Sequence, residues 1–137
     1  MSNKQRVAEK CEALWRHATK NRKPKHSTEA DRKREGTYTN GFRNEIETWT
    51  LEQGTYTIRA TRACWQTFNL AADTEGIRRI LEILKSNKVV FKATEEGAGT
   101  RKNFGAEERY IGTDPIPAKH WKVDEGKVPS ALEKIAA

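Results

Sequence analysis

The sequence predicts an α+β fold: an N-terminal amphipathic helix and a basic arm, then an antiparallel sheet of about five strands packed on one central helix. Apolar residues recur at helical spacing over residues 3–20 and again over residues 74–86. Between them, residues 43–70 are rich in Thr, Trp, Tyr and Ile, as strands are. Consecutive strands favour an antiparallel sheet over a parallel one. We expect residues 1–40 to form the helix and a flexible arm, and residues 41–137 to form a single α+β domain.

The first helix is predicted over residues 3–20. Its apolar stripe consists of Val7, Cys11, Leu14, Trp15 and Ala18. These positions lie on one side of a 3.6-residue helix, and the opposite side carries Lys and Arg. Asn21 and Pro24 are expected to end the helix.

The next segment, residues 21–40, reads NRKPKHSTEADRKREGTYTN. It combines dense charge with Pro24, Gly36 and several hydroxyl residues, and it has few large apolar side chains. Such a composition provides little surface to bury, so we expect a loop or a disordered arm.

The sheet is predicted to start with two strands in EIETWTLEQGTYTIRAT, joined by a hairpin turn at Gln53-Gly54. The residues CWQTFNLA, 64–71, are expected to form a third strand. In the second strand, Ile58 and its alternate neighbours face one side, and the polar Arg59 faces the other.

The central helix is predicted over residues 74–86, with Asp73 as its N-cap. Its apolar stripe is Ile77, Ile80, Leu81 and Leu84. After it we expect a strand over residues 88–94, a glycine-rich connection over 95–105 and a returning strand over 107–113. The chain then looks irregular until Pro129, which is expected to open a short terminal helix.

The net charge of +7 is carried by the N-terminal quarter of the chain. Residues 1–34 contain eleven Lys and Arg against four Asp and Glu, whereas residues 35–137 contain fifteen of each. A positive arm beside a neutral domain indicates an electrostatic role. Lys and Arg bind the phosphates of nucleic acid without reading its sequence.

The leading hypothesis is therefore a non-catalytic nucleic-acid-binding protein. The basic arm would hold phosphates, and a sheet face with aromatic and Arg side chains would meet bases or sugars. Neither DNA nor RNA is favoured by the sequence. The predicted binding residues are Arg16, Lys20, Arg22, Lys23, Lys25, Arg32, Lys33, Arg34, Trp49, Arg59, Arg62, Trp65, Arg101 and Lys102.

Two other classes of function stay open. In one, the chain is a protein-binding inhibitory module, and its basic arm docks on an acidic surface of a partner enzyme or complex. In the other, it is a small nucleotide-ligand binder or an enzyme that uses Arg59, Arg101, Lys102 and Tyr110.

The sequence carries no motif for a metal site, a cofactor or catalysis. The glycine-rich loop lacks the Gly-Lys-Ser/Thr of a phosphate-binding Walker loop, and Cys11 and His17 do not have zinc-site spacing. We expect no cofactor and favour a binding protein over an enzyme. With no run of about 18 apolar residues, no apolar signal segment and two cysteines, a cytoplasmic, reducing location without membrane contact is expected. A Cys11–Cys64 bridge and a homodimer paired through open sheet edges also stay open.

Overall fold

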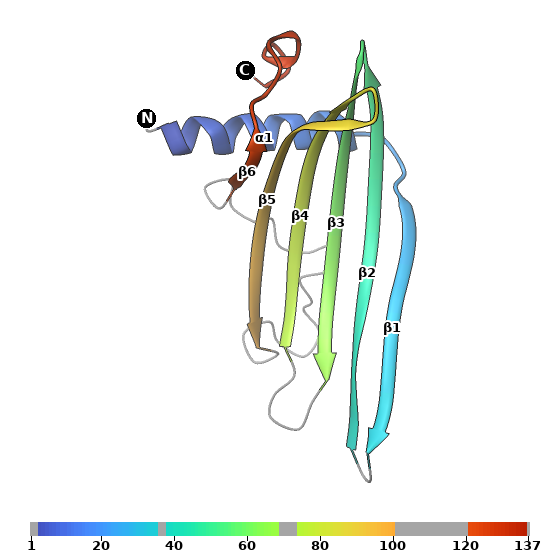
Figure 1. Cartoon of the computed structure of the whole chain (residues 1–137). Helices are drawn as coiled ribbons and strands as arrows, with labels where there is room; N and C mark the ends of the chain where they lie inside the picture. Colours follow the sequence, from blue (N-terminus) through green and yellow to red (C-terminus); the bar gives the residue numbers. More distant parts are fainter. Residues whose placement is uncertain (1–2, 36–37, 69–73, 101–120, 137) are drawn as a thin grey trace.

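The computed structural model describes residues 3–35, 38–68, 74–100 and 121–136. Within these ranges, one N-terminal helix packs on an antiparallel open sheet of six strands, so the predicted α+β class is confirmed. The strands are neighbours in chain order (Figure 1). The elements are α1 (Asn3–Thr19), β1 (Lys25–Glu35), β2 (Tyr38–Gln53), β3 (Tyr56–Phe68), β4 (Thr74–Lys85), β5 (Lys88–Thr100), β6 (Lys122–Gly126) and the short 3-10 helix η2 (Ser130–Leu132).

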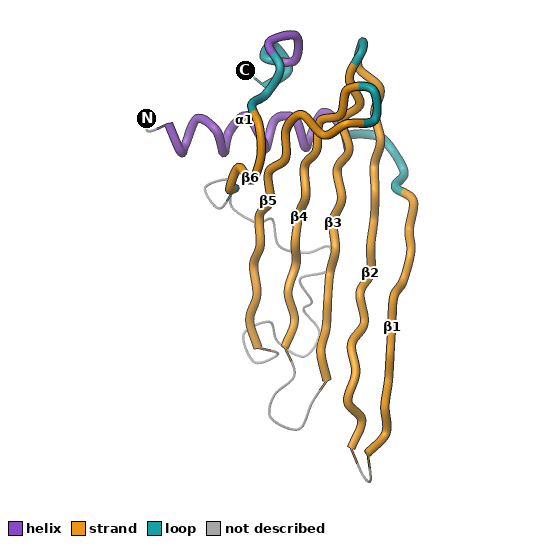
Figure 2. Tube along the Cα trace, in the orientation of Figure 1, coloured by secondary structure: helices purple, strands orange, loops and turns teal. Residues whose placement is uncertain are grey.

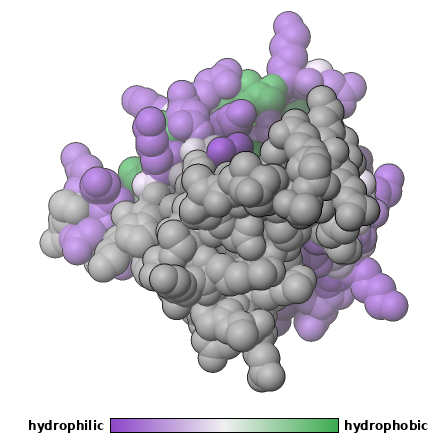
Figure 3. All heavy atoms as spheres, turned by 90° about the horizontal axis from the view of Figure 1, so that it is seen from below, coloured by the Kyte–Doolittle hydropathy of each residue, from purple (hydrophilic) through white to green (hydrophobic). Residues whose placement is uncertain are grey.

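The helix α1 lies across one face of the sheet, close to the β2–β3 and β4–β5 hairpins (Figure 2). Its bounds agree with the predicted helix. It ends at Thr19, and Asn21, two residues later, has φ of 57°, the left-handed conformation common just after a helix. Figure 3 shows the molecule from below, relative to the view of Figure 1. Most of the described surface visible from that side is hydrophilic.

Two tight turns fix the register of the sheet. Gly54, with φ of 63°, lies in the β2–β3 turn, where the sequence predicts a hairpin. Ser86 and Asn87 join β4 to β5 and have φ of 52° and 65°. Positive φ at both central residues is the geometry of a type I′ hairpin, whose twist matches that of the paired strands.

The prediction of a central helix over residues 74–86 is wrong, because this segment is the strand β4. It pairs with β3 on one side and β5 on the other. The pattern of Ile77, Ile80, Leu81 and Leu84 fits a helix. Yet the alternation of Ile77, Leu81 and Ile83 also fits a strand that is buried on one side. Pairing with neighbours on both sides overrides the local helical preference.

The prediction of a loop over residues 21–40 is also wrong for most of its length. Residues 25–35 form β1, which pairs with β2 from Lys25 opposite Thr48 to Glu35 opposite Tyr38. An edge strand needs backbone partners on one side only, so it forms without an apolar face, and charged side chains discourage unwanted pairing at the edge. Residues 25–35 of the predicted basic arm are therefore part of the sheet.

The remaining expectations are met in part. Residues 64–68 continue β3 and do not begin a third strand. The predicted strand over 88–94 is confirmed and extends to Thr100, so the first residues of the glycine-rich connection belong to β5. The predicted strand over 107–113 lies outside the described residues. The segment before Pro129 contains β6, and the terminal helix is reduced to the short η2.

The core lies between α1 and the sheet and is built in cross-strand rows. The row nearest the hairpins joins Leu51, Ile58, Ile83 and Phe91 across β2 to β5. The next row consists of Trp49, Ala60, Leu81 and Ala93. All but Leu51 are buried, and Leu51 is partly buried against this core. Burying such side chains is the main source of stability for a fold of this kind.

Candidate nucleic-acid interface

Helix α1 buries one side against the sheet and exposes the other. Ala8, Cys11, Leu14, Trp15 and Ala18 face the sheet and are buried. Most cations of α1, of the connection to β1 and of the first position of β1 are exposed, and they lie at the α1 end of the molecule. This group of cations, called the basic ridge below, consists of Lys4, Arg6, Lys10, Arg16, Lys20, Arg22, Lys23 and Lys25.

Most cations of the basic ridge are free of ion pairs. Lys10 is half-buried and lies 3.0 Å from a carboxylate oxygen of Glu133. The other seven side chains are exposed and make no ion pair within the part of the chain that the structure describes. Glu9 is the one exposed acid among residues 3–25, since Glu12 is partly buried.

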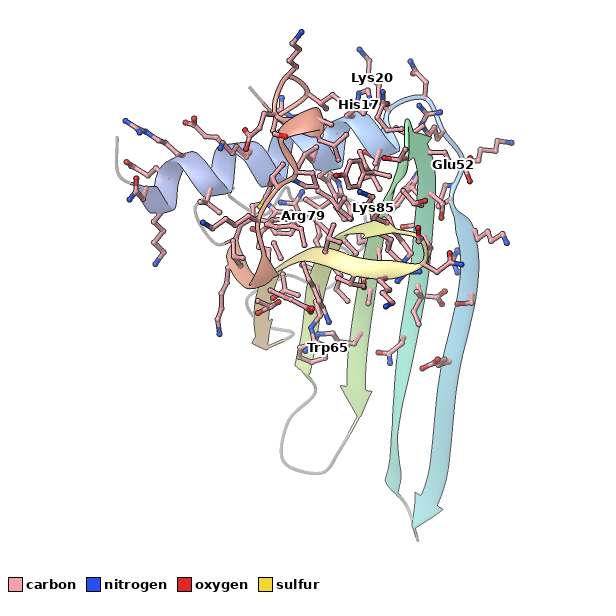
Figure 4. The ribbon with its side chains drawn as sticks, turned by 45° about the horizontal axis from the view of Figure 1, so that its top comes forward. His17, Lys20, Glu52, Trp65, Arg79 and Lys85 are labelled. Carbon is pink, nitrogen blue, oxygen red and sulfur yellow. The ribbon has the colours of Figure 1, made fainter. Side chains whose placement is uncertain are left out.

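The connection from α1 to β1 is held against the β2–β3 hairpin. Trp49 donates its indole Nε1–H to the backbone oxygen of Arg22 over 3.1 Å. His17 Nε2 lies 3.2 Å from Gln53 Oε1. These contacts hold the chain on either side of Lys20, between His17 and Arg22. His17 and Lys20 lie close together at this end of α1 (Figure 4).

The rotation of α1 about its own axis is fixed by Arg79, which lies between the helix and the sheet (Figure 4). Its guanidinium donates to both oxygens of Glu12 on α1, over 3.2 and 2.8 Å, and to Glu95 on β5. It also lies 5.1 Å from the ring centre of Trp15 and 4.7 Å from that of Trp121. Hydrogen bonds between charged groups and cation–π contacts both strengthen when they are shielded from water.

The same row of the sheet carries a second ion pair. Glu47, Arg62, Arg79 and Glu95 are direct cross-strand neighbours on β2, β3, β4 and β5. Arg62 donates through Nε to Glu47 over 2.9 Å and lies over the Trp49 ring. The two arginines thus pair outward, each with the carboxylate on its far side. This charged row borders the apolar core under α1.

The two carboxylates that accept hydrogen bonds from Arg79, those of Glu12 and Glu95, have pKa values that shift in opposite directions. Burial raises the pKa of Glu12, but the hydrogen bonds from Arg79 and Trp121 and the charge of Arg79 outweigh it and lower this pKa. Burial raises the pKa of Glu95 by more than Arg79 lowers it. Glu95 is 1% exposed, and its Oε1 has no hydrogen-bond partner among the described residues. A proton on Glu95 relieves the excess of negative charge around a single arginine.

These shifts give opposite contributions to stability across the acid range. The lowered pKa of Glu12 stabilises the fold above its ordinary value of 4.5, and this contribution is lost as pH falls through the folded-state pKa. The raised pKa of Glu95 means that the folded state binds its proton more tightly than the unfolded state. Stability from Glu95 is therefore greatest below pH 4.5 and declines as pH rises through the folded-state pKa.

The opposite face of the sheet is separate from the basic ridge. By strand alternation, Arg59 and Trp65 point to the face that α1 does not cover. Arg59 donates through Nε to Glu82 over 3.0 Å, and Trp65 is partly exposed, farther along the strands from α1 (Figure 4). The predicted single face with Arg59, Arg62, Trp49 and Trp65 does not exist, because these residues divide between two faces.

The structure sorts the predicted binding residues into five groups. Arg16, Lys20, Arg22, Lys23 and Lys25 are exposed on the basic ridge, and Arg32, Lys33 and Arg34 belong to β1, where the described part covers the backbone alone. Trp49 and Arg62 face the core side and Arg59 and Trp65 the other. Arg101 and Lys102 lie outside the described residues, as does Tyr110. Trp49, one of the predicted binding residues, is buried, with only 8% of it accessible.

Sequence reasoning does not find the residues that orient the ridge, Arg79, Glu12 and Glu95. The helical pattern assigns Arg79 to the polar side of a helix, which hides its place in a strand between Arg62 and Glu95. The signal available in the sequence is the turn-favouring pair Ser86-Asn87, which in the structure joins residues 74–85 to residues 88–100.

Within the described ranges, the two cysteines form no disulfide and no group of side chains could hold a metal ion. Cys11 and Cys64 are both buried free thiols. Burial raises the pKa of Cys11 to about 12 and that of Cys64 to about 11. Across the described ranges, His, Cys, Asp and Glu side chains do not gather into a group that could hold a metal ion. Helix α1 is neither long nor apolar enough to cross a membrane, and the described ranges contain no other candidate.

Comparison with known proteins assigns no relative, since no family model, no curated protein and no solved structure matches this chain.

Proposed function

We propose that this chain binds nucleic acid by contacting phosphates with the basic ridge. The observation that carries the proposal is a run of five exposed cations without ion pairs in the described part, from the end of α1 to the first residue of β1: Arg16, Lys20, Arg22, Lys23 and Lys25. Exposed cations held on an ordered backbone bind a polyanion with less loss of conformational entropy than cations on a disordered arm. Binding releases the counterions that condense on nucleic acid, which makes the affinity depend on salt.

The contacts are to phosphates and not to bases. Trp15, Trp49 and Trp121 belong to the core under α1, and each is at most 8% exposed. Buried rings provide no surface on which bases can stack, and stacking is the main route to binding single strands. We therefore expect duplex to be preferred over a single strand of equal length, because its charge density is higher, and we expect little sequence preference.

The test is fluorescence anisotropy with a labelled duplex and a labelled single strand, as a function of salt concentration. The triple variant K20A/R22A/K23A should make the negative slope of log affinity against log salt shallower by up to about 3. Each phosphate that the variant no longer neutralises accounts for roughly 0.9. The matched control is K88A/K122A/K134A, which removes three exposed lysines outside the basic ridge. Equal effects of the two variants would refute the location.

A second class of function uses the same surface. The basic ridge also fits an acidic protein surface, as an inhibitory module would require. Oligonucleotide binding no tighter than about 0.1 mM at physiological salt, the weak limit of non-specific binding, would favour a protein partner over nucleic acid.

A further inference from the structure

A groove lies beside the N-terminal half of α1, at the end of the helix opposite the α1–β1 connection. The first turns of α1, strands β5 and β6 and the segment after β6 enclose about 480 Å³. Pockets that hold small molecules fall in the range of roughly 300–1,000 Å³. The floor consists of Val7, Phe91, Val123 and Val128.

Part of the floor is apolar surface that the described residues leave accessible. Val123 is 37% exposed. Among the described residues, it is the large hydrophobic residue that is classed as exposed. Val7 and Val128 are partly buried and pack against the main core, so the floor is continuous with that core. An apolar chain lying here would remove this surface from water, which is favourable in proportion to its area.

The rim of the groove is positive. Arg6 and Lys127 are exposed and make no ion pair with any described residue. Lys10 is held by Glu133, the one carboxylate among the described residues of the lining. The N-terminal end of α1 adds partial positive charge, and the first turn of the helix contains no acidic side chain to offset it. The rim therefore selects an anion.

We propose that this groove binds a single-chain anionic amphiphile of the fatty-acid type. The carboxylate lies between Arg6 and Lys127, and the alkyl chain covers Val123, Val7 and Val128. Two cations, a helix N-terminus and an apolar floor are complementary to a charged head on an apolar tail, and the volume suits one chain and not a bilayer. Ligand carboxylate and Glu133 compete for Lys10 at the inner end of the rim.

The test is isothermal titration calorimetry of the full chain with dodecanoate, below the concentration at which it forms micelles. R6Q/K127Q should weaken binding tenfold or more, and uncharged dodecanol should bind at least tenfold more weakly than dodecanoate. Val123→Thr, which keeps the volume but replaces a methyl group by a hydroxyl, should weaken binding severalfold. The matched control, K20A/K23A, removes two charges from the other end of α1 and should change the affinity less than twofold.

Three results would overturn the proposal: no heat of binding with dodecanoate, equal binding of dodecanol, or equal loss in K20A/K23A. Binding to vesicles of anionic phospholipid without binding of monomeric dodecanoate would also overturn it, in favour of a membrane surface. Far-UV circular dichroism of each variant separates loss of the site from loss of the fold. The K20A/R22A/K23A variant separates this proposal from the nucleic-acid proposal, because it should lose duplex affinity and keep dodecanoate affinity.

Discussion

Replacing Arg79 by methionine should lower the free energy of unfolding by about 3–5 kcal/mol, because it removes one partner of a buried ion network. Methionine keeps most of the side-chain length, so the space between Trp15 and Trp121 stays largely filled. The carboxylate of Glu95, 1% exposed, would lose its hydrogen-bond donor. Glu12 would keep only the indole N–H of Trp121, over 3.0 Å.

The assay is urea unfolding at pH 7, followed by tryptophan fluorescence, with the melting temperature as a second readout. For a chain of this length the melting temperature should fall by roughly 10 °C or more. The matched control is Arg59→Met on the neighbouring strand, whose ion pair with Glu82 is 39% exposed at the arginine side chain. Exposed pairs contribute about 0–1 kcal/mol. If R79M costs no more than R59M, the network does not hold α1 in place.

A second substitution tests the cause of the loss. Adding Glu95→Gln to R79M removes the unpaired buried charge and should recover part of the stability. If the double variant is as unstable as the two single losses combined, the damage comes from packing and not from charge.

Three further predictions concern single features. Glu95→Gln should abolish the decline of stability as pH rises above 4.5, so the difference from the parent in urea unfolding should grow from pH 4 to 7; a constant difference would contradict the raised pKa. Gly126→Ala should cost about 2 kcal/mol or more, because its Cβ would lie 1.9 Å from a β5 backbone oxygen at φ of 73°. Gly54→Ala, at φ of 63° with open space around it, should cost about 1 kcal/mol, and calorimetry should rank the two. Cys11 and Cys64 should react with a thiol reagent only on unfolding, and fast labelling of the native protein at pH 8 would refute their burial.

The extent to which the sequence predicts this fold depends on how far each element is fixed locally. Helix α1 and the Gly54 hairpin are visible because apolar periodicity and a turn residue coincide there. Strand β4 is not, because its Ile and Leu positions satisfy both a helical stripe and strand alternation. Only its pairing with β3 and β5 decides between them.

The candidate site is predictable in its charge and not in its geometry. The concentration of Lys and Arg before residue 35 can be read directly from the sequence. Arg16 and Lys20 are exposed, as the pattern of the first helix predicts. Strand β1 has no apolar alternation, so its pairing with β2 cannot be seen in the sequence. The face to which Trp49 and Trp65 turn depends on the register of β3, which brings Trp49 under α1 and takes Trp65 to the other side.

The charged row across the sheet has a consequence for the alignment of the strands during folding. A strand that slides by two residues keeps its faces, so apolar rows alone would tolerate the slip with modest loss. Here a two-residue slip of β4 against β5 would set Arg79 opposite Ala93 or Gly97 and leave Glu95 facing Leu81 or Ile77. Each misaligned pairing buries a charge without its counterion, which is far more costly than a poor apolar contact. The charged row thus makes a shifted register of β4 against β5 unfavourable. It favours the observed pairing over other pairings of these long strands.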